Sequence, residues 1–349
     1  MKINEILIWW YQNNKRDLPW RRTRDPYAIW VSEIILQQTR VSQGIDYYCR
    51  FMNRFPDLVS LAGAKIEEVL KAWQGLGYYS RARNMHAAAV VMVSVHGGKF
   101  PSTYRELMGL KGIGPYTAAA IASIAFDEPR AVIDGNVHRV IARLFGFSDP
   151  PGGRGSGAIS RKARELLDEA APGIYNQAIM EFGALVCTPA NPSCGSCPLQ
   201  ECCIAYRRGQ VEKLPVKGKN IKQRHRYFHY FIIKSGDRIL VRQRENKDIW
   251  QWLFEFPLIE TSHPTSPVGL MESPSWNQLF MNREVRPSRV SGTIRHRLTH
   301  QVIHARFYHL DGIPAGLASG LPFQEVPLND ISKLPVPKLI ENYLDRLID

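Results

Sequence analysis

The stretch Leu110–Arg139, LKGIGPYTAAAIASIAFDEPRAVIDGNVHR, decides how the rest of the chain is interpreted. In its first part Gly112 and Gly114 precede Pro115, which opens a strongly helical run to Phe126. Glycines in a turn, followed by proline at the first helical position, are typical of a tight connection between two helices. Such a turn presents backbone N–H groups that can bind a phosphate diester without reading its base. An ordinary helical hairpin explains the glycines equally well.

The second part of this stretch ends an apolar run at Asp134, and a new helical pattern starts directly after it with Asn136 and Val137. Asp134 is therefore expected at a helix N-cap, where the helix dipole and free N–H groups keep a carboxylate ionised. Capping is the commoner role of such an aspartate. A catalytic role for Asp134 depends on what other groups lie near it.

Composition points to a polyanionic partner. The chain has 349 residues, enough for about two domains, and its 45 Lys and Arg exceed its 32 Asp and Glu to give a net charge of +13. This surplus favours nucleic acid over a membrane surface. No apolar run approaches the roughly 18 residues of a membrane-spanning helix, and the amino terminus lacks a signal-peptide layout. We expect a cytosolic or nucleoid-associated bacterial protein without a membrane partner.

The texture of the chain changes after Arg208. Residues 1–208 have a helical pattern almost throughout, and residues 209–226 read as a basic linker with little apolar content. Residues 227–349 combine strand and helix patterns. Strands are expected at 227–233, 238–244, 254–259 and 302–310, and short helices at 276–280 and 339–347. The predicted fold is an all-α domain followed by an α+β domain.

A second carboxylate lies on an early helix. Asp25-Pro26 predicts a helix that runs to Thr39 and carries Glu33. The residues three and four positions from Glu33 are mostly apolar: Ile29, Trp30, Leu36 and Gln37. Burial there should raise the pKa of Glu33 and keep a proton donor available near neutral pH. A lone glutamate is more often exposed or paired with arginine, but one protonated acid beside one carboxylate suits glycosidic bond cleavage.

Five of the six cysteines lie between Cys187 and Cys203. Cys187, Cys194, Cys197 and Cys203 are separated by six, two and five residues. Four thiolates in so short a loop can bind either zinc, the commoner structural metal, or an iron–sulfur cluster. Cys202 is expected to be a bystander, and Cys49 is expected in the core.

Three further motifs carry a family resemblance: RDLPWR at 16–21, SEIILQQT at 32–39 and LGYYSRARN at 76–84. With the glycine turn and Asp134, they resemble the adenine DNA glycosylases of the MutY family, which belong to the helix-hairpin-helix, Gly/Pro-Asp superfamily. The resemblance implies a helix-hairpin-helix glycosylase domain with a [4Fe-4S] loop at the four cysteines. A Nudix-like domain follows. The implied substrate is double-stranded DNA with adenine opposite 8-oxoguanine or guanine, bound by a monomer.

The resemblance also assigns roles to individual residues. Glu33 would protonate the adenine ring at N7, Asp134 would stabilise or trap the sugar cation, and Asn136 would orient the attacking water. The remaining matches fall into three groups: Arg16 and Gln177 lining the adenine pocket; Gln38, Thr39, Leu76 and Tyr78 beside the oxidised guanine, with Gln37 in the same substrate-binding stretch; and Lys111, Gly112 and Gly114 on the DNA backbone.

Tyr116 separates this chain from bifunctional relatives similar to endonuclease III, which carry a lysine at that position. A phenol cannot form a Schiff base with the sugar, so base removal without strong lyase activity is expected. A bifunctional glycosylase and lyase is the alternative enzyme, and a non-catalytic iron–sulfur DNA-binding protein is the alternative from another class. The loop 188–193 lacks Lys and Arg, which reduces its expected share of DNA binding.

The carboxy-terminal domain is expected to read the oxidised base. WQWLFEFP at 250–257 resembles the family's Nudix-like strand, but Arg283-Glu284 stands without the rest of a Nudix metal box, which argues against nucleotide hydrolysis. The family's hydroxyl-histidine reader loop is best matched by Leu298-Thr299-His300. Exposed polar residues on a strand are the alternative interpretation of His300.

Overall fold

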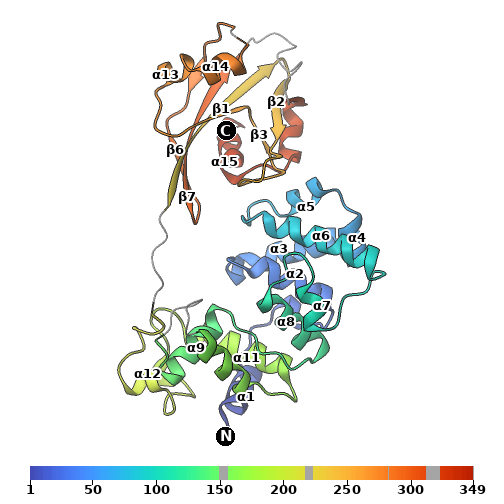
Figure 1. The fold of residues 1–349 in the computed structure, drawn as a ribbon, viewed down its shortest axis with the longest axis vertical. Coiled ribbons are helices and arrows are strands. Elements are labelled where there is room, and N and C mark those ends of the chain that lie inside the picture. The colour runs from blue at the N-terminus through green and yellow to red at the C-terminus, as the bar shows by residue number, and fades with distance from the viewer. Residues whose placement is uncertain (149–155, 217–222, 282, 312–322, 349) are drawn as a thin grey trace. The chain divides into compact units, whose positions relative to one another are not determined.

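The computed structural model describes residues 1–148, 156–216, 223–281, 283–311 and 323–348 (Figure 1). The chain divides into two compact units, Met1–Ala64 with Arg83–Lys219, and Lys65–Ala82 with Asn220–Asp349. The segment Lys65–Ala82 therefore groups with the carboxy-terminal residues, although sequence patterns place it inside the helical domain. Each unit has its own hydrophobic core and is described separately.

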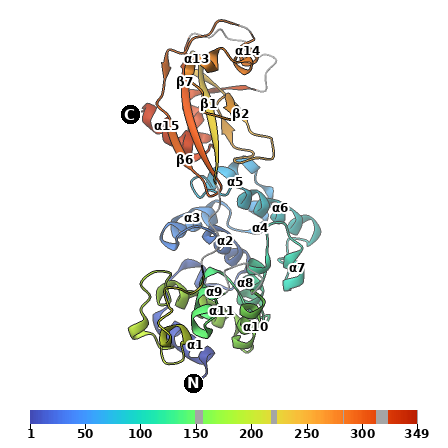
Figure 2. The same cartoon turned by 60° about the vertical axis from the view of Figure 1, so that its left-hand side comes forward.

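The first unit is built from helices, drawn in blue to yellow-green in Figures 1 and 2. Its elements are α1 (Ile3–Asn14), η1 (Pro19–Arg21), α2 (Pro26–Leu36), α3 (Val41–Arg54), α4 (Leu58–Gly63), most of α6 (Ser80–Val95), α7 (Tyr104–Met108), α8 (Pro115–Phe126), α9 (Gly135–Phe145), α10 (Ser156–Leu166), α11 (Pro172–Leu185), η2 (Cys194–Ser196) and α12 (Ile204–Arg207).

Helix starts in this unit are fixed by short polar side chains. Asp25 caps α2 by accepting the N–H groups of Tyr27 and Ala28, and Pro26 follows at the first helical position. Asp134 caps α9 by accepting the N–H of Val137 at 2.7 Å. The caps expected at Asp25 and Asp134 are thus present. Asp25 caps the helix that carries Glu33, and Asp134 caps α9 with its own carboxylate.

Helix α11 is the centre of the first unit and packs against α1, α8 and α9. Its Phe182 meets Trp10 of α1 edge to face, with ring centroids 5.1 Å apart. Gly183 allows a close approach to α9, because a Cβ there would lie 2.7 Å from the Cβ of Asn136. The small residue therefore sets how near α11 comes to the start of α9.

The second unit is a mixed sheet with helices on both faces. Its strands are β1 (Arg224–Ser235), β2 (Arg238–Gln243), β3 (Phe254–Glu255), β4 (Leu258–Thr261), β5 (Arg289–Val290), β6 (Ile294–Arg297), β7 (Gln301–Leu310) and β8 (Gln324–Pro327). The central pair, β1 and β7, is parallel from Arg224↔Gln301 to Ile233↔Leu310. β4 pairs with β1, β6 with β7 and β8 with β2.

The helices of the second unit are α5 (Ile66–Ala72), α13 (Pro267–Met271), α14 (Pro274–Leu279), η3 (Leu328–Lys333) and α15 (Lys338–Ile348). On one face Phe231 of β1 packs against Trp276 of α14. On the other face Phe307 of β7 stacks on Tyr343 of α15, with centroids 3.7 Å apart. Side chains alternate between the two faces along each strand, so both faces are partly buried.

The all-α domain followed by an α+β domain is confirmed, with differences at element ends. The helix after Pro26 ends at Leu36 and not at Thr39, and Gln38 has a left-handed φ of 63°. The basic residues Arg224–Arg226, read from sequence as linker, begin β1 instead. Their basic character indicated a solvated linker. In the folded chain, however, Arg226 is buried and forms ion pairs with Asp248 and Glu260.

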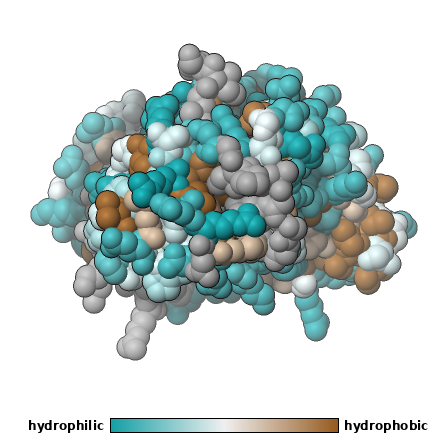
Figure 3. Space-filling model, turned by 90° about the horizontal axis from the view of Figure 1, so that it is seen from above, coloured by the Kyte–Doolittle hydropathy of each residue, from teal (hydrophilic) through white to brown (hydrophobic). Residues whose placement is uncertain are grey.

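The exposed surface carries both hydrophilic and apolar side chains. The face drawn in Figure 3 is mainly hydrophilic, with separate brown patches. Large exposed apolar residues lie at scattered places in the sequence, such as Trp9, Val59, Val95, Tyr206 and Val268. Among the helices that the structure describes, none combines the length and the apolar character required to span a bilayer.

Candidate active site

The glycine turn joins α7 to α8 as the sequence predicts. Gly112 has a φ of +82°, and a Cβ there would lie 2.6 Å from the Cβ of Asn84, so only glycine fits. Lys111 is exposed. Gly114 is the N-cap of α8 and supplies no side-chain cap, so the first-turn N–H groups remain available to an anion.

Glu33 lies on α2 with only 8% of its surface exposed. Burial raises the pKa of Glu33 from 4.5 to about 7. The hydroxyl of Tyr116, at the start of α8, donates a hydrogen bond to Glu33 Oε2 at 2.5 Å, which opposes this rise. The nearby charge of Asp134 adds to it. The raised pKa keeps a proton available on Glu33 near neutral pH.

Asp134 and Asn136 form the second part of the same site. Asn136 Nδ2 donates to Asp134 Oδ2 at 2.7 Å, while the other carboxylate oxygen accepts the N–H of Val137. Burial raises the pKa of Asp134, although both hydrogen bonds act to lower it. The helix N-terminus thus limits the rise in the pKa of Asp134. It does not bring that pKa below its usual value, which differs from the expectation from sequence.

Arg139, which sequence reasoning missed, fixes Asn136 from behind. Its guanidinium donates to Asn136 Oδ1 at 2.8 Å, to the carbonyl of Gly183 at 2.7 Å and to the carbonyl of Cys187 at 2.7 Å. One buried side chain therefore ties the start of α9 to the end of α11 and to the first cysteine. Nothing in the sequence around Arg139, which follows the cap residue by about one helical turn, indicates this role.

Arg16 does not stand alone in the structure but shares Glu181 with Arg21. Arg16 donates to both oxygens of Glu181 at 2.8 and 2.5 Å, and Arg21 does so at 2.8 and 2.8 Å. Glu181 is 1% exposed. Burial would raise its pKa, but the two guanidinium groups lower it to about 2. Arg21 also acts on Glu33 by charge, so this cluster borders the buried acid.

Two of the predicted substrate glutamines make contacts within the first unit. Gln177, one helical turn before Glu181 on α11, accepts the hydroxyl of Tyr11 at 3.0 Å. Gln37 donates to the hydroxyl of Thr117 at 3.3 Å. Gln38 is exposed and Thr39 is half-buried in the turn that follows α2. Hydrogen bonds and charge thus join Glu33, Tyr116, Asp134 and Asn136. Arg16 is linked to this group only through Glu181 and Arg21.

Of the residues expected beside the oxidised guanine, Leu76 and Tyr78 fall in the second unit. Leu76 is 9% exposed, whereas Tyr78 is 44% exposed and has a left-handed φ of 46°. Arg81 holds this loop by donating to the carbonyls of Leu76 and Gly77, each at 3.2 Å. The hydroxyl of Tyr78 bonds to that of Thr299. Two residues that lie more than two hundred positions apart in sequence therefore meet.

The turn that carries Thr299 and His300 joins β6 to β7 and is exposed. Leu298 N–H donates to the carbonyl of Gln301 at 2.8 Å, which closes the turn. From β1, the N–H of Arg224 donates to the carbonyl of His300 at 2.9 Å. Gln223 donates to the carbonyl of Leu298 at 3.0 Å. The turn is thus supported by the residues read from sequence as linker.

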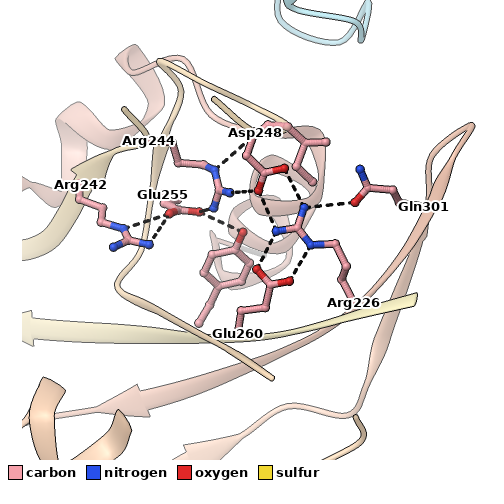
Figure 4. A network of polar contacts seen from close by, with 9 residues as sticks. Arg226, Arg242, Arg244, Asp248, Glu255, Glu260 and Gln301 are labelled. Carbon is pink, nitrogen blue, oxygen red and sulfur yellow. Dashed lines mark hydrogen bonds and ion pairs between the residues drawn. The ribbon is translucent and has the colours of Figure 1, made fainter. Parts of the chain in front are cut away.

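A charge network lies behind this turn (Figure 4). Arg226 is 6% exposed and donates to Asp248 at 2.9 and 2.7 Å, to Glu260 at 2.7 and 2.6 Å and to Gln301 at 3.1 Å. Arg244 continues the network from Asp248 to the buried Glu255. The first residue of β7 is therefore fixed by side chains from β1, β4 and the loop after β2.

Four cysteines line one cavity of about 30 Å³: Cys187, Cys194, Cys197 and Cys203. Among the described residues, no three His, Cys, Asp or Glu side chains are placed to hold one metal ion. Burial and the neighbouring thiolates raise the pKa of Cys197 to about 11. Arg143 donates to Cys187 Sγ at 3.5 Å. Cys202 does not line the cavity. Cys49 is exposed, so the prediction that it lies in the core is wrong.

Comparison with known proteins identifies the family. Residues 31–169 match the HhH-GPD superfamily of base excision DNA repair proteins, and residues 229–346 match the NUDIX domain. An adenine DNA glycosylase of Buchnera aphidicola subsp. Schizaphis graminum is 37% identical over 264 residues, which cover 74% of this chain and 75% of the relative. The chain belongs to the adenine DNA glycosylase family.

Other members of the adenine DNA glycosylase family are longer than this chain. The mouse (Mus musculus) adenine DNA glycosylase is 48% identical over 222 residues, which cover 60% of this chain but 43% of the mouse protein. The chain thus matches less than half the length of that relative. A solved thermostable thymine-DNA glycosylase aligns with a TM-score of 0.55 and 28% identity, over 59% of this chain and 95% of its own.

Substitution of Glu181 tests whether its ion pairs with Arg16 and Arg21 stabilise the fold. Glu181→Gln removes the charge that two arginines share and should lower the free energy of unfolding by about 3 kcal/mol. This is the lower end for a broken buried ion pair, because glutamine still accepts hydrogen bonds and Arg16 is partly exposed. Asp17→Asn, which breaks the exposed pair with Arg22, is the matched control and should change stability little.

The same variant has a defined pH signature. Since the folded-state pKa of Glu181 is lowered from 4.5 to about 2, its stabilising contribution is present above pH 4.5 and lost as pH falls toward 2. As pH falls through this window, the free energy of unfolding of the parent protein, measured with denaturant, should therefore decrease more steeply than that of Glu181→Gln. Equal stability and equal pH dependence of the two proteins would contradict the assigned ion cluster.

Proposed function

We propose that the protein is a monofunctional DNA glycosylase that hydrolyses the N-glycosidic bond of adenine opposite 8-oxoguanine, or guanine, in duplex DNA. One observation carries the proposal. A buried glutamate with a pKa of about 7, Glu33, stands with Tyr116 beside a capping carboxylate, Asp134. Such a pair supplies a proton and a negative charge to the two sides of a breaking glycosidic bond.

Protonation of the leaving base is assigned to Glu33. With a pKa raised to about 7, Glu33 keeps a proton available near neutral pH and can transfer it to adenine N7. Protonation turns adenine into a neutral leaving group, and the electrons of the glycosidic bond go to the base. The Tyr116 hydroxyl, which donates to Glu33 Oε2, fixes which carboxyl oxygen can face the base.

Stabilisation of the sugar is assigned to Asp134. As the bond breaks, positive charge develops on the sugar ring, and the carboxylate of Asp134 is held by Asn136 and the N–H of Val137 to oppose it. Asn136, itself fixed by Arg139, orients the carboxylate and the water that completes hydrolysis. The position of a lyase lysine is occupied by Tyr116, which is half-buried and offers no amine to the sugar.

The second unit is proposed to recognise the base opposite adenine. Thr299 and His300 stand exposed on a turn that Arg224 and Gln301 hold in place, and Tyr78 reaches the Thr299 hydroxyl. The partner is duplex DNA, bound by a monomer. In a bacterium such an enzyme works at the nucleoid.

A [4Fe-4S] cluster is proposed at Cys187, Cys194, Cys197 and Cys203. The four thiols surround one cavity, and the guanidinium of Arg143, which is 2% exposed, is placed to offset the negative charge of a thiolate-bound cluster. When bound, the cluster would cross-link the chain just after α11 to the start of α12. Arg143 also donates to the carbonyl of Thr188 at 2.7 Å, which connects the same loop to α9 without the cluster.

The carboxylate variants test the proposed chemistry. Asp134→Asn keeps an oxygen to cap α9, so fold and duplex binding should persist, while base release should fall by about 10³-fold because the transition-state charge is lost. Glu33→Gln still accepts the Tyr116 hydroxyl but has no proton to give, and should lose about 10²–10⁴-fold. Single-turnover adenine release from duplexes with adenine opposite 8-oxoguanine measures both. A near-parental rate in either variant would remove that residue from the mechanism.

Variants of the reader turn test recognition separately from chemistry. Thr299→Ala with His300→Ala should reduce the preference for 8-oxoguanine over guanine opposite adenine, since a lost hydrogen-bonded readout is worth about 1–3 kcal/mol of discrimination. The ratio of single-turnover rates on the two duplexes is the measurement. Ser332→Ala, which removes an exposed hydroxyl from η3 of the same unit, is the control. An unchanged ratio would place recognition in Gln38, Leu76 and Tyr78.

A further inference from the structure

One face of the sheet in the second unit is basic where β4, β1, β7 and β6 run together toward the reader turn. Strand register defines a row across it: Thr261, Tyr227, His304 and Arg295 stand opposite one another on adjacent strands. The row nearer the turn contains His225, Val302 and Arg297, and the row farther away contains His229 and Arg306. All these side chains share one face, because alternate residues of a strand point the same way.

The arginines of these rows give this face a charge of one sign. Among the side chains of these three rows, all of which the structure describes, are three arginines and three histidines but neither Asp nor Glu. The acids of this region, Asp248 and Glu260, contact Arg226, which points to the opposite face. We define the basic face as His225, Arg295, Arg297, His304 and Arg306. Arg295, Arg297 and His225 are exposed.

The basic face is also preformed. The rings of Tyr227 and His304 stack with centroids 4.8 Å apart, and His225 bonds to His304 at 2.9 Å. Arg306 is held by the hydroxyl of Thr293 at 2.9 Å and the carbonyl of Thr265 at 3.2 Å. A hollow of about 200 Å³ is lined by Tyr227, His229, Pro264, Thr265, Thr293, His304 and Arg306. Its walls offer a fixed guanidinium and hydroxyl groups, which suit an oxyanion.

We propose that the basic face binds the phosphate backbone of the DNA strand whose base faces the reader turn. The inference rests on the proposed function for its choice of DNA as partner. Arg297 precedes Thr299 by two residues and Arg295 by four, so they stand about 7 and 13 Å along the strand from it. Consecutive phosphates of one DNA strand recur at a comparable interval. Guanidinium groups at such spacing match phosphates without reading their bases.

This contact would explain how a chain without Lys or Arg in its 188–193 loop obtains part of its hold on DNA. A small anion could enter the hollow beside Arg306, but Arg295 and Arg297 lie outside the residues that line it. They extend the positive charge toward the turn. An extended polyanion uses the whole face, whereas a free nucleotide would use only the hollow.

Salt dependence of duplex binding by the full chain tests the proposal. Log affinity falls as log salt rises, and each lost phosphate contact makes this negative slope shallower by about 0.9. Arg295→Gln with Arg297→Gln should therefore make it shallower by about 1.8 and weaken binding. The matched control is Arg283→Gln with Arg286→Gln, which removes the same charge from exposed residues elsewhere in this unit. The control should leave the slope within about 0.5 of the parental value.

Two further readouts separate this contact from other roles. Because phosphate contacts carry no base information, adenine release under saturating protein and the preference for 8-oxoguanine over guanine should stay at parental values. A slope equal to that of the control would overturn the proposal, and is the result expected if an acidic protein or a free nucleotide occupies the face. A changed preference with an unchanged slope would also overturn it, since the arginines would then only support the turn. If the parent bound duplex without releasing adenine, the proposed function would fail and the slope comparison would still decide this inference.

Discussion

The site depends on keeping a carboxyl group, Glu33, out of water next to a second one, Asp134. Two buried carboxyl groups cannot both ionise at low cost, so burial and mutual repulsion raise the pKa of Glu33 to about 7. The folded state therefore binds this proton more tightly than the unfolded chain. Its contribution to stability is fully present below pH 4.5 and is lost as pH rises through about 7. The proton that Glu33 is proposed to donate is thus the same proton that the folded state binds more tightly than the unfolded chain.

The surrounding helices hold the site through buried arginines. Arg139 connects Asn136 to α11 and the cysteine loop, and Arg143 connects α9 to the same loop. Arg16 and Arg21 share Glu181 at the edge of the site. Each guanidinium satisfies several carbonyl or carboxylate oxygens at once, which one planar group with five donors does well. Arg226 does the same behind the reader turn (Figure 4).

Local features of the site could be predicted from sequence, and distant partnerships could not. The cap at Asp134, the turn at Gly112 and the apolar surroundings of Glu33 are determined by residues within four positions. Glu181 meets Arg16 across 165 positions, and nothing in either neighbourhood indicates the pairing. Arg226 reads as part of a basic linker until Asp248 and Glu260 neutralise it. The family resemblance located Thr299, but its contact with Tyr78 is a property of the fold.

The ionisation of Glu33 is the central claim, and it can be measured without a reaction. Infrared difference spectra between the parent and Glu33→Gln, recorded from roughly pH 4 to 9, isolate the protonated carboxyl of this one residue. We predict that its band disappears with a midpoint of about 7. Tyr116→Phe should move the midpoint higher, because the tyrosine hydrogen bond lowers this pKa. A midpoint near 4.5 in the parent, the ordinary value for glutamate, would contradict the account.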